Sequence, residues 1–329
     1  MTNRFLSCDW GTSTLRISLV DGNTGEIMCT ESSDEGMAGT FKLWSLTADA
    51  DAANRVGFYT YILDRHIKTI EKKLDISLNG VLLIISGMAS STIGFMELPY
   101  SELPFALSGE DLTVGYLSSI AGFEHEIAII SGIKSATDVM RGEETQLLGC
   151  VDVQNSSDNH VYIFPGTHSK HIYIKNSQVT DFETYMTGEF FELLSKKSLL
   201  SNSVEAGEGF PGSKYLDSFV AGVEDAIDLN LLNAAFRVRT NALFGIYDKQ
   251  ENFNYLSGLL IGTELKSLKN HHIGKIHLLC GKALELYYRV AIETLGQAYK
   301  LQTYTPQWVD EAVVRAHFRL FDQKFFKHD

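Results

Sequence analysis

The chain has 329 residues, of which 44% are hydrophobic and 21% are charged, and its formal net charge is −13 at pH 7. This negative charge argues against binding to nucleic acid or to acidic membranes, because both need a basic surface that displaces counterions. No apolar run approaches the ~20 residues of a membrane span, and the first residues lack the apolar region of a signal peptide, so we expect a cytosolic protein. The four cysteines form no C-x-x-C pair, which disfavours a zinc cluster.

The first third of the chain is predicted to form an α/β unit. Its elements are strands near 4–9, 14–21 and 26–31, an amphipathic helix over 53–73, and buried strands at 80–86 and 126–131. The closely spaced first strands predict an antiparallel edge on a mixed sheet.

The second half repeats the opening of the first. After a helical stretch through "MRGEETQLLGC", the strands "HVYIFPG", "KHIYIKN" and "QVTDFETY" follow. The later elements are helices near 187–200, 213–244 and 252–269, a strand at 275–281, a helix at 282–296, a short strand at 299–304, and a final helix from about Gln307. Since both halves open with a hairpin whose tip contains glycine, we predict two similar lobes, 1–139 and 140–329, although no sequence repeat is visible.

Two hairpin tips carry residues suited to phosphate binding. They are "DWGTST" at 9–14 and "PGTHSK" at 165–170. A tight turn with Gly exposes consecutive backbone N–H groups, and nearby hydroxyls add donors. One such tip alone is more often an ordinary β-turn, but two facing tips would hold a polyphosphate. The candidate phosphate-binding residues are Gly11, Thr12, Ser13, Thr14, Gly166, Thr167 and His168, and Asp9 is the candidate for orienting Mg²⁺ or a metal-bound water.

Six segments carry a resemblance to a known family. In chain order they are "CDWGTSTLR", "RGEETQLLG", "PGTHSK", "TGEFFELL", "SGLLIGTEL" and "LLCGKALE". This run of motifs resembles that of the 2-dehydro-3-deoxygalactonokinase family, which are sugar-acid kinases of the actin, hexokinase and heat-shock chaperone superfamily. The resemblance extends from about residue 5 to the C-terminal helix. It implies an α/β fold of two ribonuclease-H-like lobes with mixed sheets, and ATP in the cleft between them.

The resemblance also assigns roles to segments. "DWGTSTLR" resembles the first phosphate loop, "PGTHSK" the second, and "LLCGKALE", with Gly281, the adenosine segment. The lobe of residues 1–139 would then carry the first loop and the sugar-acid contacts, and the lobe of residues 140–329 the second loop and the adenosine segment. The family more often has small polar residues after this glycine, whereas this chain has Lys282 and Ala283, so the contacts to base and ribose stay open.

A kinase also needs a group that accepts the proton of the attacking hydroxyl. In the sugar kinases of this superfamily a carboxylate often lies at the start of the helix before the second phosphate hairpin, and Glu143 in "RGEETQ" resembles that position. The helix dipole keeps a carboxylate there ionised and ready to accept a proton. Glu144 is the alternative base, and both glutamates also suit the first turn of an ordinary helix.

Residues near this helix start are candidates for binding the sugar acid. The guanidinium of Arg141 would match a carboxylate with two parallel hydrogen bonds, while pairing with Glu144 or exposure to solvent is an equal alternative. The segment "SGMASSTIGF" leaves a buried strand at its C-terminal end, where α/β sheets open onto their ligands, and resembles the family's corresponding loop. Ser90 and Ser91 are therefore candidates for substrate contacts, with loop capping as the alternative.

Two further patterns are interpreted as unrelated to the chemistry. The run "GEGFPG" at 207–212 matches G-x-G-x-x-G, but it follows a polar stretch and contains Pro211, so we predict a surface loop. His168 and His171 have metal-like spacing, yet on a strand this offset puts them on opposite faces. We therefore assign His168 to the phosphate tip and predict His171 at the surface.

The leading hypothesis is phosphoryl transfer from Mg·ATP to the 6-hydroxyl of 2-dehydro-3-deoxy-D-galactonate, as in galactonate catabolism. Positioning and charge neutralisation would supply most of the catalysis. One alternative is a kinase of the same fold that acts on another sugar or sugar acid, and the other is a non-catalytic actin-like nucleotide switch. We expect ATP and a small sugar acid as ligands, and the sequence leaves open whether the chain forms a homo-oligomer.

Overall fold

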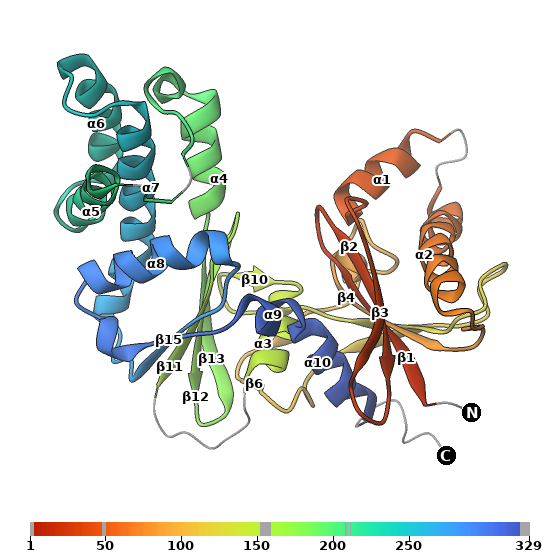
Figure 1. Cartoon of the computed structure of the whole chain (residues 1–329). Helices are drawn as coiled ribbons and strands as arrows, with labels where there is room; N and C mark the ends of the chain where they lie inside the picture. The colour runs from red at the N-terminus through yellow and green to blue at the C-terminus, as the bar shows by residue number, and fades with distance from the viewer. Residues whose placement is uncertain (1–2, 48–50, 152–158, 208, 211, 323–329) are drawn as a thin grey trace. The chain divides into compact units, whose positions relative to one another are not determined.

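The chain divides into two compact units (Figure 1). The computed structural model describes residues 3–47, 51–151, 159–207, 209–210 and 212–322. Unit 1 comprises Met1–Gln154 and Asp310–Asp329, and unit 2 comprises Asn155–Val309. This division differs from the predicted boundary at residue 140, because the helix that follows residue 140 packs within unit 1 against a helix from the segment after Asp310.

Unit 1 is built on a mixed β-sheet. Its strands are β1 (Arg4–Trp10), β2 (Leu15–Asp21), β3 (Ile27–Ser33), β4 (Leu82–Gly87), β7 (Val114–Leu117) and β8 (Ile127–Ile130). They lie in the order β3-β2-β1-β4-β8-β7, with β1 antiparallel to β2 and parallel to β4. The strands predicted in this part of the chain are confirmed within two residues of their expected bounds.

Helices and short strands complete unit 1. They are α1 (Met37–Ser45), α2 (Ala52–Leu74), α3 (Glu143–Cys150), α10 (Ala312–Leu320), the 3₁₀ turn η1 (Met88–Ser90), and the short strands β5 (Ser101–Glu102), β6 (Phe105–Ala106), β9 (Ile133–Lys134) and β10 (Val139–Met140). α2 begins where the side chain of Asp51 accepts a hydrogen bond from the Asn54 backbone N–H at 2.9 Å, which satisfies one unpaired donor of the first turn.

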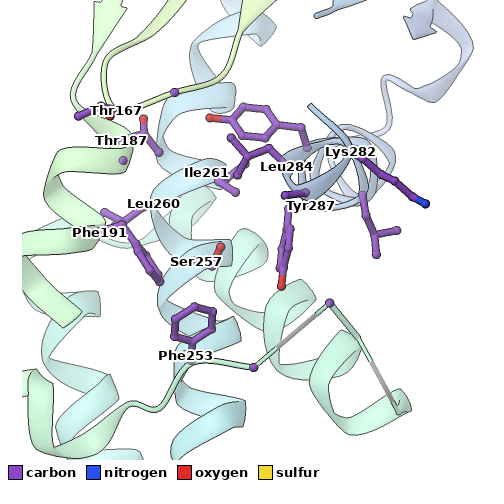
Figure 2. Close-up of a pocket in the computed structure, with 17 residues that line it drawn as sticks. Thr167, Thr187, Phe191, Phe253, Ser257, Leu260, Ile261, Lys282, Leu284 and Tyr287 are labelled. Carbon is purple, nitrogen blue, oxygen red and sulfur yellow. The ribbon is translucent and has the colours of Figure 1, made fainter. Parts of the chain in front are cut away.

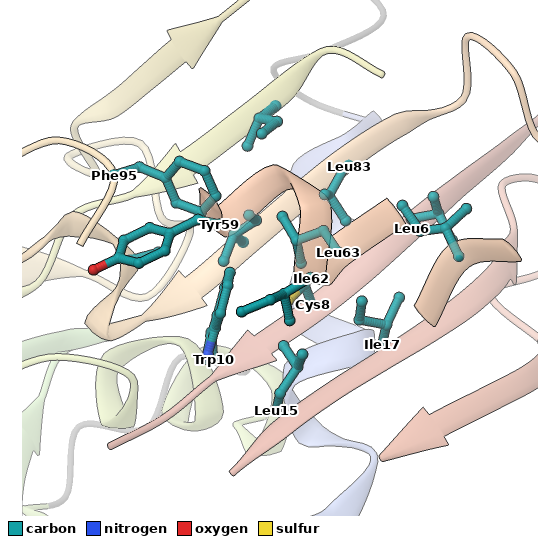
Figure 3. Close-up of a cluster of buried hydrophobic side chains, with 14 of the residues drawn as sticks. Leu6, Cys8, Trp10, Leu15, Ile17, Tyr59, Ile62, Leu63, Leu83 and Phe95 are labelled. Carbon is teal, nitrogen blue, oxygen red and sulfur yellow. The ribbon is translucent and has the colours of Figure 1, made fainter. Parts of the chain in front are cut away.

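The core of unit 1 lies between the sheet and α2 (Figure 3). Trp10, Tyr59 and Phe95 form an aromatic cluster with ring centroids 5.3 to 5.8 Å apart. The indole N–H of Trp10 also donates to the Glu35 carbonyl at 2.9 Å. The last residue of β1 is therefore fixed immediately before the first glycine-bearing tip.

The C-terminal helix α10 returns to unit 1 and packs on α3. Arg315 donates to the carbonyl of Gly149 at 2.9 Å, and Arg319 donates to those of Leu148 and Val151 at 2.6 and 2.9 Å. Cationic side chains at the last carbonyls of a helix satisfy unpaired acceptors and complement the helix dipole. α10 thus stabilises α3, the helix that begins with the candidate base.

A buried histidine joins α10 to the sheet. The ring nitrogens of His317 lie 2.8 Å from Ser7 Oγ and 2.6 Å from Ser86 Oγ, on β1 and β4. Burial lowers the pKa of His317 to about 3, so the ring is neutral at pH 7. One ring nitrogen then donates and the other accepts, which lets a single side chain bridge two hydroxyls.

Unit 2 has the same sheet topology. Its strands are β11 (His160–Phe164), β12 (Ser169–Lys175), β13 (Gln178–Tyr185), β14 (Lys275–Leu278) and β15 (Leu301–Thr303). In the order β15-β14-β11-β12-β13, the first strand β11 is antiparallel to β12 and parallel to β14, as β1 is to β2 and β4. The predicted α/β fold with two ribonuclease-H-like lobes and mixed sheets is confirmed.

Helices cover the sheet of unit 2 and extend beyond it. They are α4 (Thr187–Glu192), η2 (Leu193–Lys197), η3 (Leu199–Ser203), α5 (Ser213–Asp228), α6 (Leu231–Phe244), α7 (Lys249–Leu265), η4 (Lys266–Asn270), α8 (Lys282–Thr294), η5 (Ala298–Lys300) and α9 (Pro306–Asp310). The single helix predicted over 213–244 is two helices, because the Asn230 side chain accepts from the Leu232 N–H at 3.0 Å and starts a new one. None of the described helices has the length and apolar character needed to cross a membrane.

Candidate functional site

The first glycine-bearing tip is held from behind by α1. The Gly11 N–H donates to the Thr14 carbonyl at 3.0 Å, which closes the turn. The carbonyls of Gly11 and Thr12 accept from the first N–H groups of α1, at Met37 (2.9 Å) and Ala38 (3.1 Å). Thr12, Ser13 and Thr14 are exposed, so their hydroxyls are open to a ligand.

A close approach at Gly36 sets the position of this tip. Gly36 is the N-cap of α1, and a methyl group added there would lie within 3.0 Å of the backbone N, Cα and C of Ser13. Real Cβ atoms do not approach backbone that closely, so only glycine lets the helix lie against the loop.

The second tip is supported in the same way by α4. The Glu189 N–H donates to the Thr167 carbonyl at 3.1 Å. A methyl group at Gly188 would lie 2.6 Å from the Gly166 carbonyl oxygen and 2.8 Å from Thr167 Cα. Thr167 and His168 are exposed, and the His168 ring is paired with the Glu189 carboxylate. Both predicted phosphate loops are therefore exposed turns supported by the helix after the third strand.

Three chain segments of unit 1 meet beyond the end of β1. Gly87 is the last residue of β4 and has φ +89°, and a methyl group there would lie 2.6 Å from the Trp10 carbonyl oxygen and 3.6 Å from Asp9 Oδ1. Gly142, with φ +106°, is the N-cap of α3 and would place its methyl group 3.5 Å from Gly87 Cα. The start of α3 is far from Asp9 in the sequence, but the contacts through Gly87 bring it close to Asp9 in the fold.

Asp9 occupies the end of β1 opposite Arg16 on β2. Burial raises the pKa of the Asp9 carboxyl above its ordinary value, and the positive charge of Arg16 partly opposes the shift. Arg16 also donates to the Asp310 carbonyl at 3.2 Å. A cation at this position would restore the ionised form of Asp9, because an opposite charge nearby favours the carboxylate.

The two glutamates at the start of α3 have different surroundings. Glu144 is buried, and its carboxylate accepts from the Gly142 N–H at 2.7 Å and the Thr145 hydroxyl at 3.0 Å. Burial, together with the nearby charge of Glu143, raises the pKa of Glu144 to about 8. Glu143 is partly exposed. A carboxyl with a raised pKa is a poorer proton acceptor at pH 7, so Glu143, which is also the more exposed of the two, stays the candidate base.

Arg141 is held in a fixed orientation by unit 1. Its Nε donates to the Tyr100 hydroxyl at 3.0 Å, Nη1 to Ser90 Oγ at 2.7 Å and Nη2 to the Leu98 carbonyl at 3.4 Å, and its Cζ lies 4.0 Å from the centroid of the Tyr100 ring. A guanidinium has five N–H donors, so one remains on each Nη for a ligand carboxylate.

The predicted substrate serines are both buried. The Ser90 hydroxyl is fully buried and receives the bond from Arg141. The Ser91 hydroxyl donates to the Met88 carbonyl at 2.7 Å and closes the η1 turn. Direct contact of either serine with a substrate stays a prediction. The bond to Arg141 points instead to an indirect role for Ser90.

A pocket of about 860 Å³ lies within unit 2 beside the second tip (Figure 2). It begins at Gly166 and Thr167 and reaches the first turn of α8 at Lys282, Ala283 and Leu284. This volume is in the range of small-molecule sites, which span roughly 300 to 1,000 Å³. The pocket therefore joins the predicted second phosphate loop to the predicted adenosine segment, whose Gly281 is the N-cap of α8.

Several residues that line this pocket were not predicted from the sequence. They are Thr187, Gly188, Phe191, Gly207, Gly209, Phe253, Ser257, Leu260, Ile261, Leu286, Tyr287 and Tyr288. The run "GEGFPG", interpreted above as a loop without a role, contributes two of its glycines. The resembling segment "TGEFFELL" contained a usable signal, because it starts at Thr187 and includes Phe191. Figure 2 shows the Lys282 side chain extending away from the other labelled side chains.

The prediction that His171 lies at the surface is wrong. His171 is fully buried, and its Nε2 lies 2.9 Å from Glu264 Oε1. Consecutive residues from Ser169 to Ile172 are buried, so both faces of β12 are covered. Alternation put His171 on the face opposite His168 but could not show that this face is also covered.

The residues present are compatible with a magnesium ion that binds together with a nucleotide. Among the described residues no group of three or more His, Cys, Asp or Glu side chains could hold a metal ion by itself. Mg²⁺ commonly takes one or two protein carboxylates, and phosphate and water oxygens complete its coordination. Asp9, a lone carboxylate beside the first tip, meets that requirement.

Taken together, these features define a class of protein. A ribonuclease-H-like topology occurs twice, each copy has an exposed glycine-bearing loop after its first strand, and a partly exposed carboxylate begins the helix that precedes the second hairpin. This combination is that of a phosphotransferase with the actin-like ATPase fold.

The family model described as 2-keto-3-deoxy-galactonokinase matches residues 9–315, and the chain belongs to that family of kinases. The 2-dehydro-3-deoxygalactonokinase of Escherichia coli (strain K12) is 32% identical over 90% of this chain and 91% of its own length. "Probable 2-dehydro-3-deoxygalactonokinase DgoK1" of Rhizobium meliloti (strain 1021) is 31% identical over 89% and 90%. A crystal structure from Sinorhizobium meliloti, provisionally described as a 2-dehydro-3-deoxygalactonokinase, matches with a TM-score of 0.78 at 28% identity, covering 97% of this chain and 98% of that one. The resemblance stated from the six segments is confirmed.

Proposed function

We propose that this chain transfers the γ-phosphoryl group of ATP to the 6-hydroxyl of 2-dehydro-3-deoxy-D-galactonate, giving the 6-phosphate and ADP. The observation that carries the proposal is the family match over residues 9–315. The loops, the helix-start carboxylate and the anchored guanidinium support it, because the reaction needs phosphate binding, a proton acceptor and recognition of a sugar-acid carboxylate.

In this proposal unit 2 binds most of the nucleotide. Adenosine occupies the pocket between α7 and α8, and the N–H groups and hydroxyls of Gly166, Thr167 and His168 bind phosphate oxygens. In unit 1, Gly11 and the exposed hydroxyls of its tip bind phosphate in the same manner. Transfer requires both loops to act on one nucleotide during turnover, since catalysis here is mainly positioning.

Glu143 is the proposed base. Its helix-start position favours the ionised form, and its partial exposure lets a hydroxyl approach. It accepts the proton of the 6-hydroxyl as the oxygen attacks the γ-phosphorus and the bond to ADP breaks. Glu144, protonated and hydrogen-bonded to its own helix start, supports the backbone at Gly142.

Arg141 is the proposed partner of the substrate carboxylate. Its contacts with Tyr100 and Ser90 fix the guanidinium before substrate arrives, which lowers the entropy cost of binding. Asp9 would hold Mg²⁺, which supplies neutralisation of phosphate charge when bound. Asp9 itself orients that cation beside the first tip.

A screen of ADP release tests the reaction and the acceptor together. Purified protein with Mg·ATP would be assayed against 2-keto-3-deoxy sugar acids and against aldoses that lack a carboxylate. We expect ADP release with 2-dehydro-3-deoxy-D-galactonate and none with the aldoses. Release with an aldose alone would favour the kinase of another sugar. ATP-dependent association with a protein, without release stimulated by any sugar, would favour the nucleotide switch.

A matched pair of variants tests the base. Glu143→Gln should lower kcat by about 10²- to 10⁴-fold, the usual contribution of a general base, with nucleotide affinity nearly unchanged. Glu144→Gln keeps a neutral, similarly shaped group and should retain most of kcat. The reverse ranking would assign the base to Glu144 instead.

A further inference from the structure

A buried carboxylate in unit 2 has no part in the reaction as proposed. Glu264 lies near the end of α7, in the largely apolar segment "SGLLIGTEL", and is 2% exposed. Its Oε1 is 2.9 Å from His171 Nε2, and its Oε2 accepts from the Tyr288 hydroxyl at 2.8 Å and from the Thr187 hydroxyl. Three donors from three other elements therefore meet at this single carboxylate.

The donor and acceptor roles in this network follow from its contacts. His171 Nδ1 is buried without a hydrogen-bond partner among the described atoms, whereas Nε2 faces Glu264 Oε1, so Nε2 is the nitrogen that donates to the carboxylate. Burial, and after it the charge of Glu264, raises the pKa of Tyr288, so its hydroxyl stays a donor. The carboxylate accepts and all three partners donate.

The network reaches the second phosphate loop along two routes. The Tyr288 hydroxyl lies 3.1 Å from Ser169 Oγ, and Ser169 Oγ accepts from the Gly166 backbone N–H at 3.3 Å. Thr187 immediately precedes Gly188, and the close approach of Gly188 to Gly166 and Thr167 fixes the position of the loop relative to α4. One buried carboxylate thus contacts Tyr288 and Thr187, the two residues from which these routes lead to the loop.

We propose that Glu264 is a positioning residue that fixes the second phosphate loop and thereby sets the affinity for the phosphates of ATP. The inference rests on the proposed function for the identity of the ligand. Glu264 does not touch the nucleotide in this scheme. It orients Ser169 through Tyr288, and α4 through Thr187.

Comparing phosphate-bearing and phosphate-free ligands tests this role. Glu264→Gln replaces one acceptor oxygen with an amide donor that faces donors, so the network cannot be satisfied. We expect the Kd for ATP and ADP, measured by calorimetry, to rise about 10- to 100-fold, as for loss of hydrogen bonds to a charged group. The Kd for adenosine should rise by a clearly smaller factor, because adenosine has no phosphates for the loop to bind, although Thr187 and Tyr288 also line its pocket.

Asp225→Asn is the matched control. Asp225 is a carboxylate of α5 that accepts from a tyrosine hydroxyl, that of Tyr255 at 2.6 Å, and from Arg237, and none of these residues lines the pocket. It should lower thermal stability without changing the Kd for ATP. If Glu264→Gln lowers the melting temperature as Asp225→Asn does, with ATP affinity within about twofold of wild type, the residue is only structural and the inference is overturned.

Ser169→Ala keeps the inference testable if the Glu264 variant fails to fold. It removes the acceptor of the Gly166 N–H and should weaken ATP but not adenosine, and unchanged ATP affinity would overturn the inference. When both variants fold, the double variant should bind ATP only slightly more weakly than Glu264→Gln alone, since the two residues act in series. Wild-type protein that binds no ATP would overturn the proposed function as well. If Glu264→Gln binds ATP as tightly as wild type and turnover is intact, this inference is overturned and the proposed function stands.

Discussion

Replacing Gly36 with alanine should displace the proposed first phosphate loop without straining the backbone at residue 36. Gly36 has φ −64° and ψ 161°, values that any residue adopts, so the added methyl group acts only through its contacts. That methyl group would lie within 3.0 Å of three backbone atoms of Ser13, whereas carbon atoms prefer about 3.5 to 4.0 Å. Backbone cannot rotate away as a side chain can, so α1 and the loop must separate by roughly 1 Å.

The size of the effect follows from that displacement. Forcing extra volume into a packed contact costs about 1 to 3 kcal/mol of unfolding free energy. A misplacement of about 1 Å in a site costs about 10²-fold in turnover. The separation also weakens the bonds from Met37 and Ala38 to the loop carbonyls. We therefore expect Gly36→Ala to lose both stability, measured by urea unfolding, and kcat/KM for ATP.

Gly39→Ala is the control for this prediction. Gly39 is an exposed residue of the same helix, and a methyl group there would meet nothing within 4 Å. Replacing an exposed helical glycine by alanine should stabilise the fold by about 0.5 to 1 kcal/mol and leave turnover unchanged. If Gly36→Ala behaves like Gly39→Ala in both assays, the loop is not fixed by this contact and the reasoning is refuted.

Three further predictions concern charged and titratable groups. Because the pKa of Glu144 is raised from 4.5 to about 8, its contribution to stability is complete below about pH 4.5 and declines as the pH rises through about 8. Wild type should therefore lose unfolding free energy with rising pH faster than Glu144→Gln in urea titrations, and parallel curves would contradict this. The lowered pKa of His317 acts in the opposite sense: its contribution to stability is complete above pH 6.5 and declines as the pH falls towards 3. In an acid titration followed by circular dichroism, the stability of His317→Gln should therefore depend less steeply on pH than that of wild type. Arg141→Lys keeps the charge but loses the fixed fork of donors, so the KM for the sugar acid should rise about tenfold or more while the Kd for ATP stays constant, and an unchanged KM would remove Arg141 from substrate binding.

The strands and both tips could be predicted because their signals are local. Alternating and continuous apolar runs mark β1, β2 and β4, and glycine with hydroxyl residues marks the turn that follows β1. α1 was not predicted, because Gly36 caps it without a side-chain hydrogen bond and its first turn contains no acidic residue. Its start is fixed by the carbonyls of Gly11 and Thr12, which no local pattern reveals.

Parts of the candidate site depend on contacts between distant residues. Glu264 and His171 are 93 positions apart, so a carboxylate near the end of a helix and a histidine in a strand gave no sign of pairing. The anchoring of Arg141 by Ser90 similarly joins residues 51 positions apart. Local patterns therefore located the loops and the helix-start glutamates, while the partners that orient them required the folded chain.

The contact of α10 with α3 has a consequence for the order in which the protein matures. A ribosome that has finished the first stretch of unit 1 must still synthesise all of unit 2 before Arg315 and Arg319 emerge. Until then the last carbonyls of α3 lack these two cationic donors, and the serines on β1 and β4 lack His317. The unit made first is thus the one completed last, and a nascent chain stalled before Asp310 would present an open N-terminal unit to chaperones and proteases.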